Sequence, residues 1–228
     1  MSAAIQISDG KDLIEKRHID HIVRLPSNTP FGNLCLSKMA IESRIGYINI
    51  KLVSICAPFP LKLNAGIVPD FLPQLIDIPT EEVVYLIRRS TDDLICLWAL
   101  LSHFTEKGCY PTRIKCDHVG AFCEEIKKYG DTHEFADHQN WLQTLNEVSN
   151  AYKHSIMQRQ LQVLSTREPT VLVMIFKRND SSNPHDFKRM SLAELVAGFE
   201  KFYQCVNLWL FNWARANPDC HQSKLYNL

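Results

Sequence analysis

Apolar residues recur every three or four positions over most of this 228-residue chain, and this spacing constrains its fold more than any other sequence feature. Residues three and four apart share one face of a helix, so such stripes indicate helices with one side toward a core. We predict helices at 34–56, 80–107, 117–129, 134–159 and 191–217. The predicted fold class is all-α, an antiparallel up-and-down bundle of about five helices.

Several of these helices carry recognisable end signals. Thr80 comes directly before two glutamates, which favour the first turn of a helix. Gly130 suits the residue after a helix, and Ser191 with Glu194 matches a capping box. Pro218 stops the final helix, whose very apolar interior indicates burial on more than one side, as in a central helix or a dimer interface.

Two segments interrupt the helical pattern. Residues 58–79 contain five prolines and cannot form one long helix, so we expect this segment to pack across the bundle. Residues 160–178 hold two β-type runs, which predict a short hairpin followed by a polar loop. We expect an N-terminal extension at 1–33, one bundle domain at 34–217 and a C-terminal tail at 218–228. The bundle domain includes the proline-rich segment and a hairpin insertion at 160–190.

Charge and cysteine usage exclude several classes of protein. The chain has 25 basic and 25 acidic residues, which argues against broad, non-specific nucleic-acid binding. Charge is nevertheless uneven, with seven acids and two bases in 117–147 but seven bases and three acids in 153–189. The chain lacks a secretory signal pattern, a long apolar run and any CxxC pair. We therefore expect a reduced cytoplasmic protein that has no contact with a membrane.

Common enzyme and metal signatures are missing from the sequence. The GxGxxG, GxxxxGK[ST], GxSxG and HExxH patterns are all absent, which argues against Rossmann, P-loop and α/β-hydrolase enzymes. The best metal candidate comprises Cys109, Cys116, His118 and Cys123, with His133 and His138 nearby. The seven-residue spacing of Cys116 and Cys123 is typical of core positions, so we predict no metal and no cofactor.

The helix predicted at 134–159 has the most chemically capable face. Glu147, Asn150 and His154 share one side of it, with Lys153 at the edge. His154 could act as general base or acid, Lys153 could hold phosphate, and Asn150 and Glu147 could orient the histidine or a substrate. The alternative is that these residues are an ordinary helix surface.

Further basic residues are candidates for substrate or partner binding. Arg88 and Arg89 each precede an aspartate by four positions, which predicts either a solvated charged turn or a cation that faces the 134–159 helix. A second basic group surrounds the predicted hairpin and could form a contact surface; it comprises Arg159, Arg167, Lys177, Arg178, Lys188 and Arg189.

The segment NAYKH, residues 150–154, within a helical bundle resembles the motif helix of divergent members of the HEPN superfamily. The resemblance implies a homodimer whose motif helices meet at a cleft that binds RNA, a nucleotide or a protein partner. It also implies metal-independent RNA cleavage of a defence or toxin–antitoxin type, with His154 as the family histidine. The family pairs this histidine with an arginine, but residues 147–149 before His154 are Glu-Val-Ser.

Two main functional hypotheses follow. The first is a HEPN-like protein that dimerises through the motif helix and the final helix and binds, or cleaves, RNA at that interface. The second is a non-enzymatic interaction protein that uses the basic hairpin surface. A weaker third hypothesis is a small-molecule or metal-binding bundle.

Overall fold

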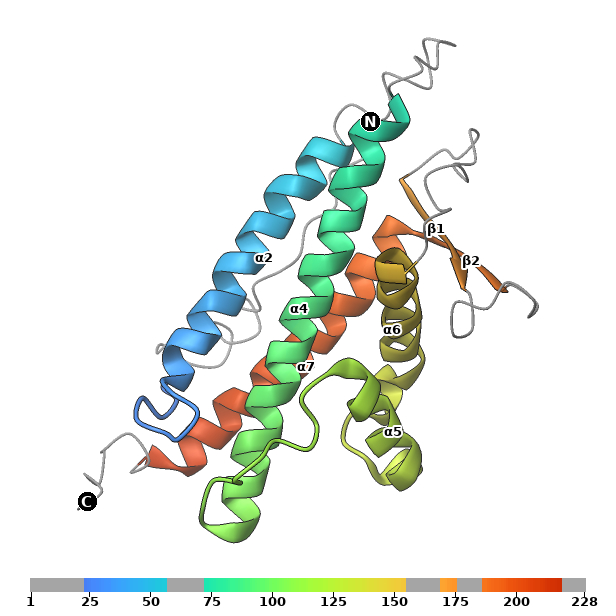
Figure 1. Cartoon of the computed structure of the whole chain (residues 1–228). Helices are drawn as coiled ribbons and strands as arrows, with labels where there is room; N and C mark the ends of the chain where they lie inside the picture. Colours follow the sequence, from blue (N-terminus) through green and yellow to red (C-terminus); the bar gives the residue numbers. More distant parts are fainter. Residues whose placement is uncertain (1–22, 57–71, 155–168, 176–185, 219–228) are drawn as a thin grey trace.

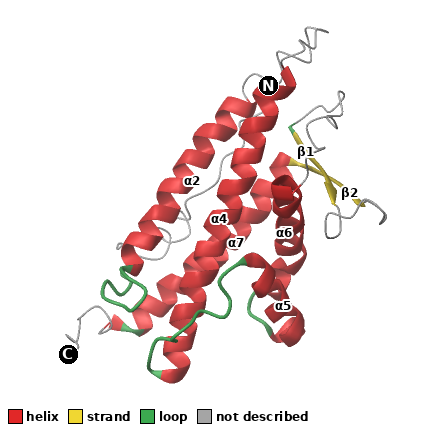
Figure 2. Cartoon of the chain, viewed as in Figure 1, coloured by secondary structure: helices red, strands yellow, loops and turns green. Residues whose placement is uncertain are grey.

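A computed structural model describes residues 23–56, 72–154, 169–175 and 186–218 of the chain. The described part is mostly helical, with one small pair of strands at its edge (Figure 2). It contains five α-helices, two short 3-10 helices and two strands: α2 (Leu34–Cys56), α4 (Leu72–Lys107), α5 (Val119–Tyr129), η1 (Gly130–Thr132), η2 (Ala136–His138), α6 (Gln139–His154), β1 (Thr170–Ile175), β2 (Asp186–Ser191) and α7 (Leu192–Ala216). The all-α prediction with a small hairpin before the last helix is confirmed.

The chain runs up and down through the bundle. Helices α2 and α6 point one way and α4 and α7 the other, while α5 lies beside the start of α6 (Figure 1). Helix α4 packs against α2, α5, α6 and α7 and is therefore the central element. Among the described residues, no helix is both long and apolar enough to cross a bilayer.

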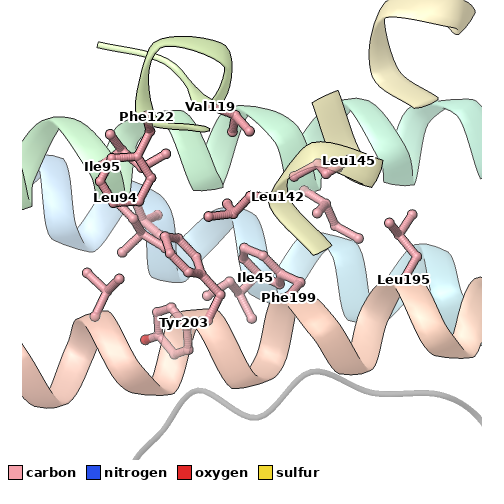
Figure 3. Packing of buried hydrophobic residues seen from close by; sticks show 14 of the residues in the cluster. Ile45, Leu94, Ile95, Val119, Phe122, Leu142, Leu145, Leu195, Phe199 and Tyr203 are labelled. Carbon is pink, nitrogen blue, oxygen red and sulfur yellow. The ribbon is translucent and has the colours of Figure 1, made fainter. Parts of the chain in front are cut away.

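The core lies where the helices converge around α4. Figure 3 shows Ile45 of α2, Leu94 of α4, Phe122 of α5, Leu142 of α6 and Phe199 of α7 in one apolar cluster. None of these five residues is more than 1% exposed. Burial of such side chains removes apolar surface from water and supplies the main favourable term in folding.

One buried lysine joins the first and last described helices. The side chain of Lys38 on α2 is only 4% exposed, and its Nζ donates to Glu42 at 2.8 Å and to the Tyr203 hydroxyl of α7 at 3.1 Å. The ammonium also lies 5.0 Å from the Tyr203 ring centroid. These contacts compensate a charge that would be costly to bury alone.

Helix α4 begins earlier than the sequence predicts. We expected a start at Thr80, but the helix begins at Leu72 and contains Pro79. Thr80 is 4% exposed, so it lies inside the helix and faces the core. The helix therefore runs across a proline, a residue that local chemistry treats as a boundary. The proline-rich prediction thus fails for 72–79, and residues 57–71 lie outside the described part.

The last helices and the hairpin also differ in detail from the prediction. Two 3-10 turns occupy 130–138, so α6 starts at Gln139 and not near residue 134. The partner of β1 is the segment 186–191, which lies beyond the predicted hairpin at 160–178; Val171 pairs with Met190 and Val173 with Lys188. The sequence DFKRMS is too polar to resemble the buried β1. The predicted first strand, 160–167, lies outside the described residues.

The apolar side of helix α7 is covered by elements of the same chain. Its capping box is formed as predicted, because Ser191 Oγ accepts from the Glu194 amide at 3.0 Å and Glu194 Oε2 accepts from the Ser191 amide at 2.8 Å. Eleven of its residues are buried within the single chain. Burial on several sides is confirmed, and it arises inside the monomer.

A close contact fixes α6 on α7. The Trp141 indole nitrogen of α6 donates to the carbonyl oxygen of Leu195 at 3.1 Å. Its ring lies over Gly198, where an added Cβ would stand 2.0 Å from a ring carbon. Only glycine permits this approach.

We predict that Gly198→Ala lowers the free energy of unfolding by about 1–3 kcal/mol, because the new methyl group displaces Trp141. Urea unfolding followed by far-UV circular dichroism measures this change. In a Trp141→Leu background the same substitution should cost much less, since the clash is gone. An equal cost in both backgrounds would show that the Trp141 contact is not the cause.

Candidate functional site

Helix α6 turns its apolar side into the core, as predicted. Leu142, Leu145 and Val148 are completely buried. Ala151, which helical spacing groups with the polar residues, is only 7% exposed, and β1 packs against this helix. The polar face is therefore narrower than the sequence predicts.

Glu147 is already engaged within the chain. Its Oε2 forms an ion pair with Nζ of Lys188 on β2, and its Oε1 accepts from Gln143 Nε2 at 3.1 Å. This pair fastens the hairpin to α6. It also neutralises one residue of the predicted catalytic face and one of the predicted basic surface.

Asn150 and Lys153 are exposed on the last turns of α6. Nδ2 of Asn150 donates to Asn146 Oδ1 at a long 3.5 Å. Asn150 and Lys153 are neighbours on one face, because they are three residues apart. His154 is the last residue of α6, and its side chain lies outside the described part.

Arg88 occupies a buried position between α4 and α6. It is 6% exposed, and its Nε donates to both carboxylate oxygens of Asp92, at 3.0 and 3.2 Å. Its Nη1 donates to Asn146 Oδ1 and to Ser149 Oγ, both at 2.9 Å. Arg88 faces α6, which is one of the two alternatives predicted, and its hydrogen bonds are made to Asp92 of its own helix and to Asn146 and Ser149 of α6.

The carboxylate of Asp92 extends this network to a third helix. Its Oδ1 also accepts from the backbone amide of Val119 at 2.8 Å, at the first residue of α5. The free amides at a helix start favour a negative charge, so Asp92 stabilises α5 while it compensates Arg88. We call Arg88, Asp92, Asn146 and Ser149 the arginine network.

Arg89 behaves as an ordinary surface residue. Its side chain is 59% exposed, and it pairs with Asp93 at 3.4 Å. Asp93 has a closer partner in Arg44 of α2, at 2.9 Å. The predicted solvated charged turn therefore fits Arg89 but not Arg88.

The described part of the predicted basic surface is divided between two faces of the hairpin. Lys188 turns toward α6 and pairs with Glu147, while Arg189 is exposed. Phe187, on the same strand face as Arg189, is 54% exposed. Arg159, Arg167, Lys177 and Arg178 lie outside the described residues.

A cavity of about 490 Å³ lies between the C-terminal half of α4 and the end of α5, and its lining includes Cys116 and His133, which the sequence suggests as part of a metal candidate. Its walls come from the C-terminal half of α4, the connection at 111–116, the end of α5 and the η1 region. Trp98, Tyr129 and His133 supply aromatic surface, with Tyr129 50% exposed. The Tyr129 and His133 ring centroids are 6.2 Å apart. We call this cavity the α4–α5 groove.

Charges of both signs line the groove. Arg113 and Lys115 are exposed, and neither takes part in an ion pair among the described residues. Glu106, Glu125 and Glu134 supply carboxylates, and Glu134 accepts a hydrogen bond from the Trp98 indole nitrogen. The groove therefore offers unpaired cations and hydrogen-bond acceptors around aromatic rings.

The titratable groups in the groove favour binding over nucleophilic chemistry. Burial raises the pKa of the Cys116 thiol, and its hydrogen bond to Glu125 raises it further. The thiol therefore stays protonated and is a poor nucleophile. Burial also lowers the pKa of His133, so its imidazole is neutral at neutral pH.

The groove is not evident from the sequence, because its residues come from three separate stretches. Trp98 and Glu106 belong to the predicted second helix, and Tyr129 and His133 surround the predicted turn at Gly130. The local signals were the two bases Arg113 and Lys115 in a loop between two helices, together with Cys116 and His133, which the sequence suggests only as part of a metal candidate.

The described residues contain no group of three or more His, Cys, Asp or Glu side chains placed to hold a metal ion. Cys116 and Cys123 are buried, as core cysteines are, although Cys116 lies before α5 and not within it. Comparison of the chain with family models, curated proteins and solved structures gives no match.

We predict that Arg88→Ala lowers the free energy of unfolding by about 3–5 kcal/mol, because it leaves Asp92, Asn146 and Ser149 without their shared donor. Arg89→Ala is the matched control. It removes the same side chain from the exposed pair with Asp93 and should cost about 0–1 kcal/mol. Urea unfolding of both variants measures the difference, and equal costs would refute a special role for the arginine network.

Proposed function

We propose that this chain is a HEPN-like bundle that binds a nucleotide, free or at the end of an RNA strand, in the α4–α5 groove. The observation that carries this proposal is the pair of unpaired cations, Arg113 and Lys115, beside the Tyr129 and His133 rings in one cavity. This site lies within one chain, whereas the resemblance to the HEPN superfamily implies a cleft between two.

The size of the groove supports a ligand of this class. Its volume of about 490 Å³ falls within the roughly 300–1,000 Å³ range of small-molecule and cofactor sites. Tyr129 is half exposed and the neutral His133 lies next to it, so a base could stack on either ring. Stacking of a base on an aromatic side chain contributes about 1–3 kcal/mol.

The charges around the groove suit the two ends of a nucleotide. The guanidinium of Arg113 can donate two parallel hydrogen bonds to a phosphate, and Lys115 adds a second positive charge. The carboxylates of Glu106 and Glu125 can accept from the amino groups of a base, as acidic side chains do with cytosine. We therefore expect guanine, adenine or cytosine to be preferred to uracil, which has no amino group.

We predict that the double variant Arg113→Ser/Lys115→Ser weakens nucleotide binding about tenfold to a hundredfold, since hydrogen bonds to charged groups are lost. Calorimetric titration with GMP, AMP, CMP and UMP measures the affinities. Arg89→Ser/Arg189→Ser is the matched control, because it removes two exposed cations outside the groove. Weaker binding in the control alone would favour the hairpin surface, and no binding by the wild type would refute the proposal.

A second candidate is the metal-independent cleavage of RNA at the end of α6. Asn150 and Lys153 are exposed on the turns that lead to His154, so a phosphate could reach them. Arg88 does not replace the missing motif arginine in this proposal, because its donors are engaged in the arginine network.

If this candidate is correct, the wild type should degrade a mixed RNA pool in EDTA and His154→Ala should not. The histidine supplies the proton transfer, which typically contributes about 10²–10⁴-fold in rate. Gel analysis of the RNA provides the measurement, with Arg24→Ala, an exposed cation before α2, as the control. Equal cleavage by all three proteins would indicate a contaminating nuclease and refute this candidate.

A further inference from the structure

Helix α2 is apolar on two opposite faces. One face enters the core through Leu34, Ile41, Ile45, Ile48, Leu52 and Ile55. The other face carries most of the large exposed hydrophobic residues of the described chain, among them Leu36 at 60%, Met39 at 57% and Ile50 at 66% exposure. A helix that is apolar on both sides is typical of one that is buried on both sides.

The exposed face has a regular and self-symmetric spacing. Its residues follow one another at steps of three, four, three, four and three positions; they are Leu36, Met39, Ser43, Gly46, Ile50 and Val53. This is the heptad spacing of a helix that pairs with another helix. The order of sizes is large, large, small, small, large, large, which is the same when the helix is reversed.

This symmetry selects the occupant of the face. We propose that the exposed stripe of α2 pairs with the same stripe of a second copy of this chain, antiparallel and about a two-fold axis near residues 44–45. Met39 then meets Ile50 of the second copy, and Leu36 meets its Val53. An interface of this kind is self-complementary, as a two-fold dimer requires.

The centre of the stripe allows the two helices to approach closely. Ser43 and Gly46 meet each other's copies at the crossing point, and a Cβ added at Gly46 would touch nothing within 4 Å. Small residues at the contact permit a short distance between helix axes. Tyr47, 41% exposed at the edge, then covers Ala40 of the second copy.

Charge does not oppose this pairing. The six stripe positions are uncharged, and among the flanking positions 35, 40, 42, 47, 49 and 54 only Glu42 is charged. The antiparallel arrangement places Glu42 opposite Asn49 of the second copy, so no like charges meet.

The area of the stripe predicts a weak dimer. The exposed apolar side chains offer on the order of 500 Å² per chain, so two copies would bury roughly 1,000 Å², which is at the lower end of specific interfaces. We therefore expect a reversible dimer with a dissociation constant on the order of micromolar. The pairing is distinct from the predicted dimer through α6 and α7, and it does not depend on nucleotide binding.

Charge substitutions at one facing pair test both the occupant and its direction. By sedimentation velocity over about 1–100 µM chain, the wild type should pass from monomer to dimer. Met39→Glu and Ile50→Lys should each give a monomer, because each places unpaired charges in the interface. The double variant should dimerise again, since each introduced carboxylate then faces an introduced ammonium group of the second copy. Phe187→Glu, on β2, removes an exposed apolar residue elsewhere and should leave the dimer unchanged.

Other outcomes would overturn the proposal. A wild type that stays monomeric over the whole range, or a Met39→Glu variant that dimerises normally, excludes this interface. A double variant that remains monomeric excludes the antiparallel pairing, because a parallel pair would place the two introduced glutamates against each other. Circular dichroism confirms that each variant is folded, which is expected because the substituted positions are exposed.

Discussion

The arrangement of helices α4, α5 and α6 depends on the hydrogen bonds of the buried Arg88 guanidinium and its partner Asp92. A charge at this depth is tolerated only when its donors are satisfied, and the partners come from α4 and α6. Asp92 pairs with Arg88 and also binds the first amide of α5. A shift of α6 or α5 would therefore leave a buried polar group unpaired, which makes their position a condition of stability.

These intramolecular ion pairs also explain which surfaces of the molecule still have charged groups free to bind a ligand. Arg88, Glu147 and Lys188 are engaged in holding elements together, so the polar surface around α6 retains few free charged groups. The connection between α4 and α5 is different, because Arg113 and Lys115 have no acidic partner within the described residues. The groove beside them thus combines free charge with a concave surface.

The sequence predicts those features that depend on local periodicity and capping. The stripe of α2, the capping box at Ser191 and the C-terminal end of α5 at Gly130 all follow from residues close together in the chain. The early start of α4 at Leu72 runs against the local signal of Pro79, and the pairing of 186–191 with β1 depends on a contact between separate segments, which local patterns do not encode. The role of Arg88 was open for the same reason, because its neighbours Asn146 and Ser149 lie about sixty residues away. The second apolar face of α2 is visible in the sequence, but only the structure shows that the described chain leaves it exposed.

The bond between Lys38 and Tyr203 has a consequence for how the chain folds during synthesis. The two residues are 165 positions apart, so α2 leaves the ribosome long before the tyrosine that contacts its buried lysine exists. Native contacts of such separation form late, because a large loop must close first. Until α7 is made, α2 carries two apolar faces that are incompletely covered, which is the kind of surface that chaperones bind. Completion of the core is therefore a late step that awaits the last helix of the bundle.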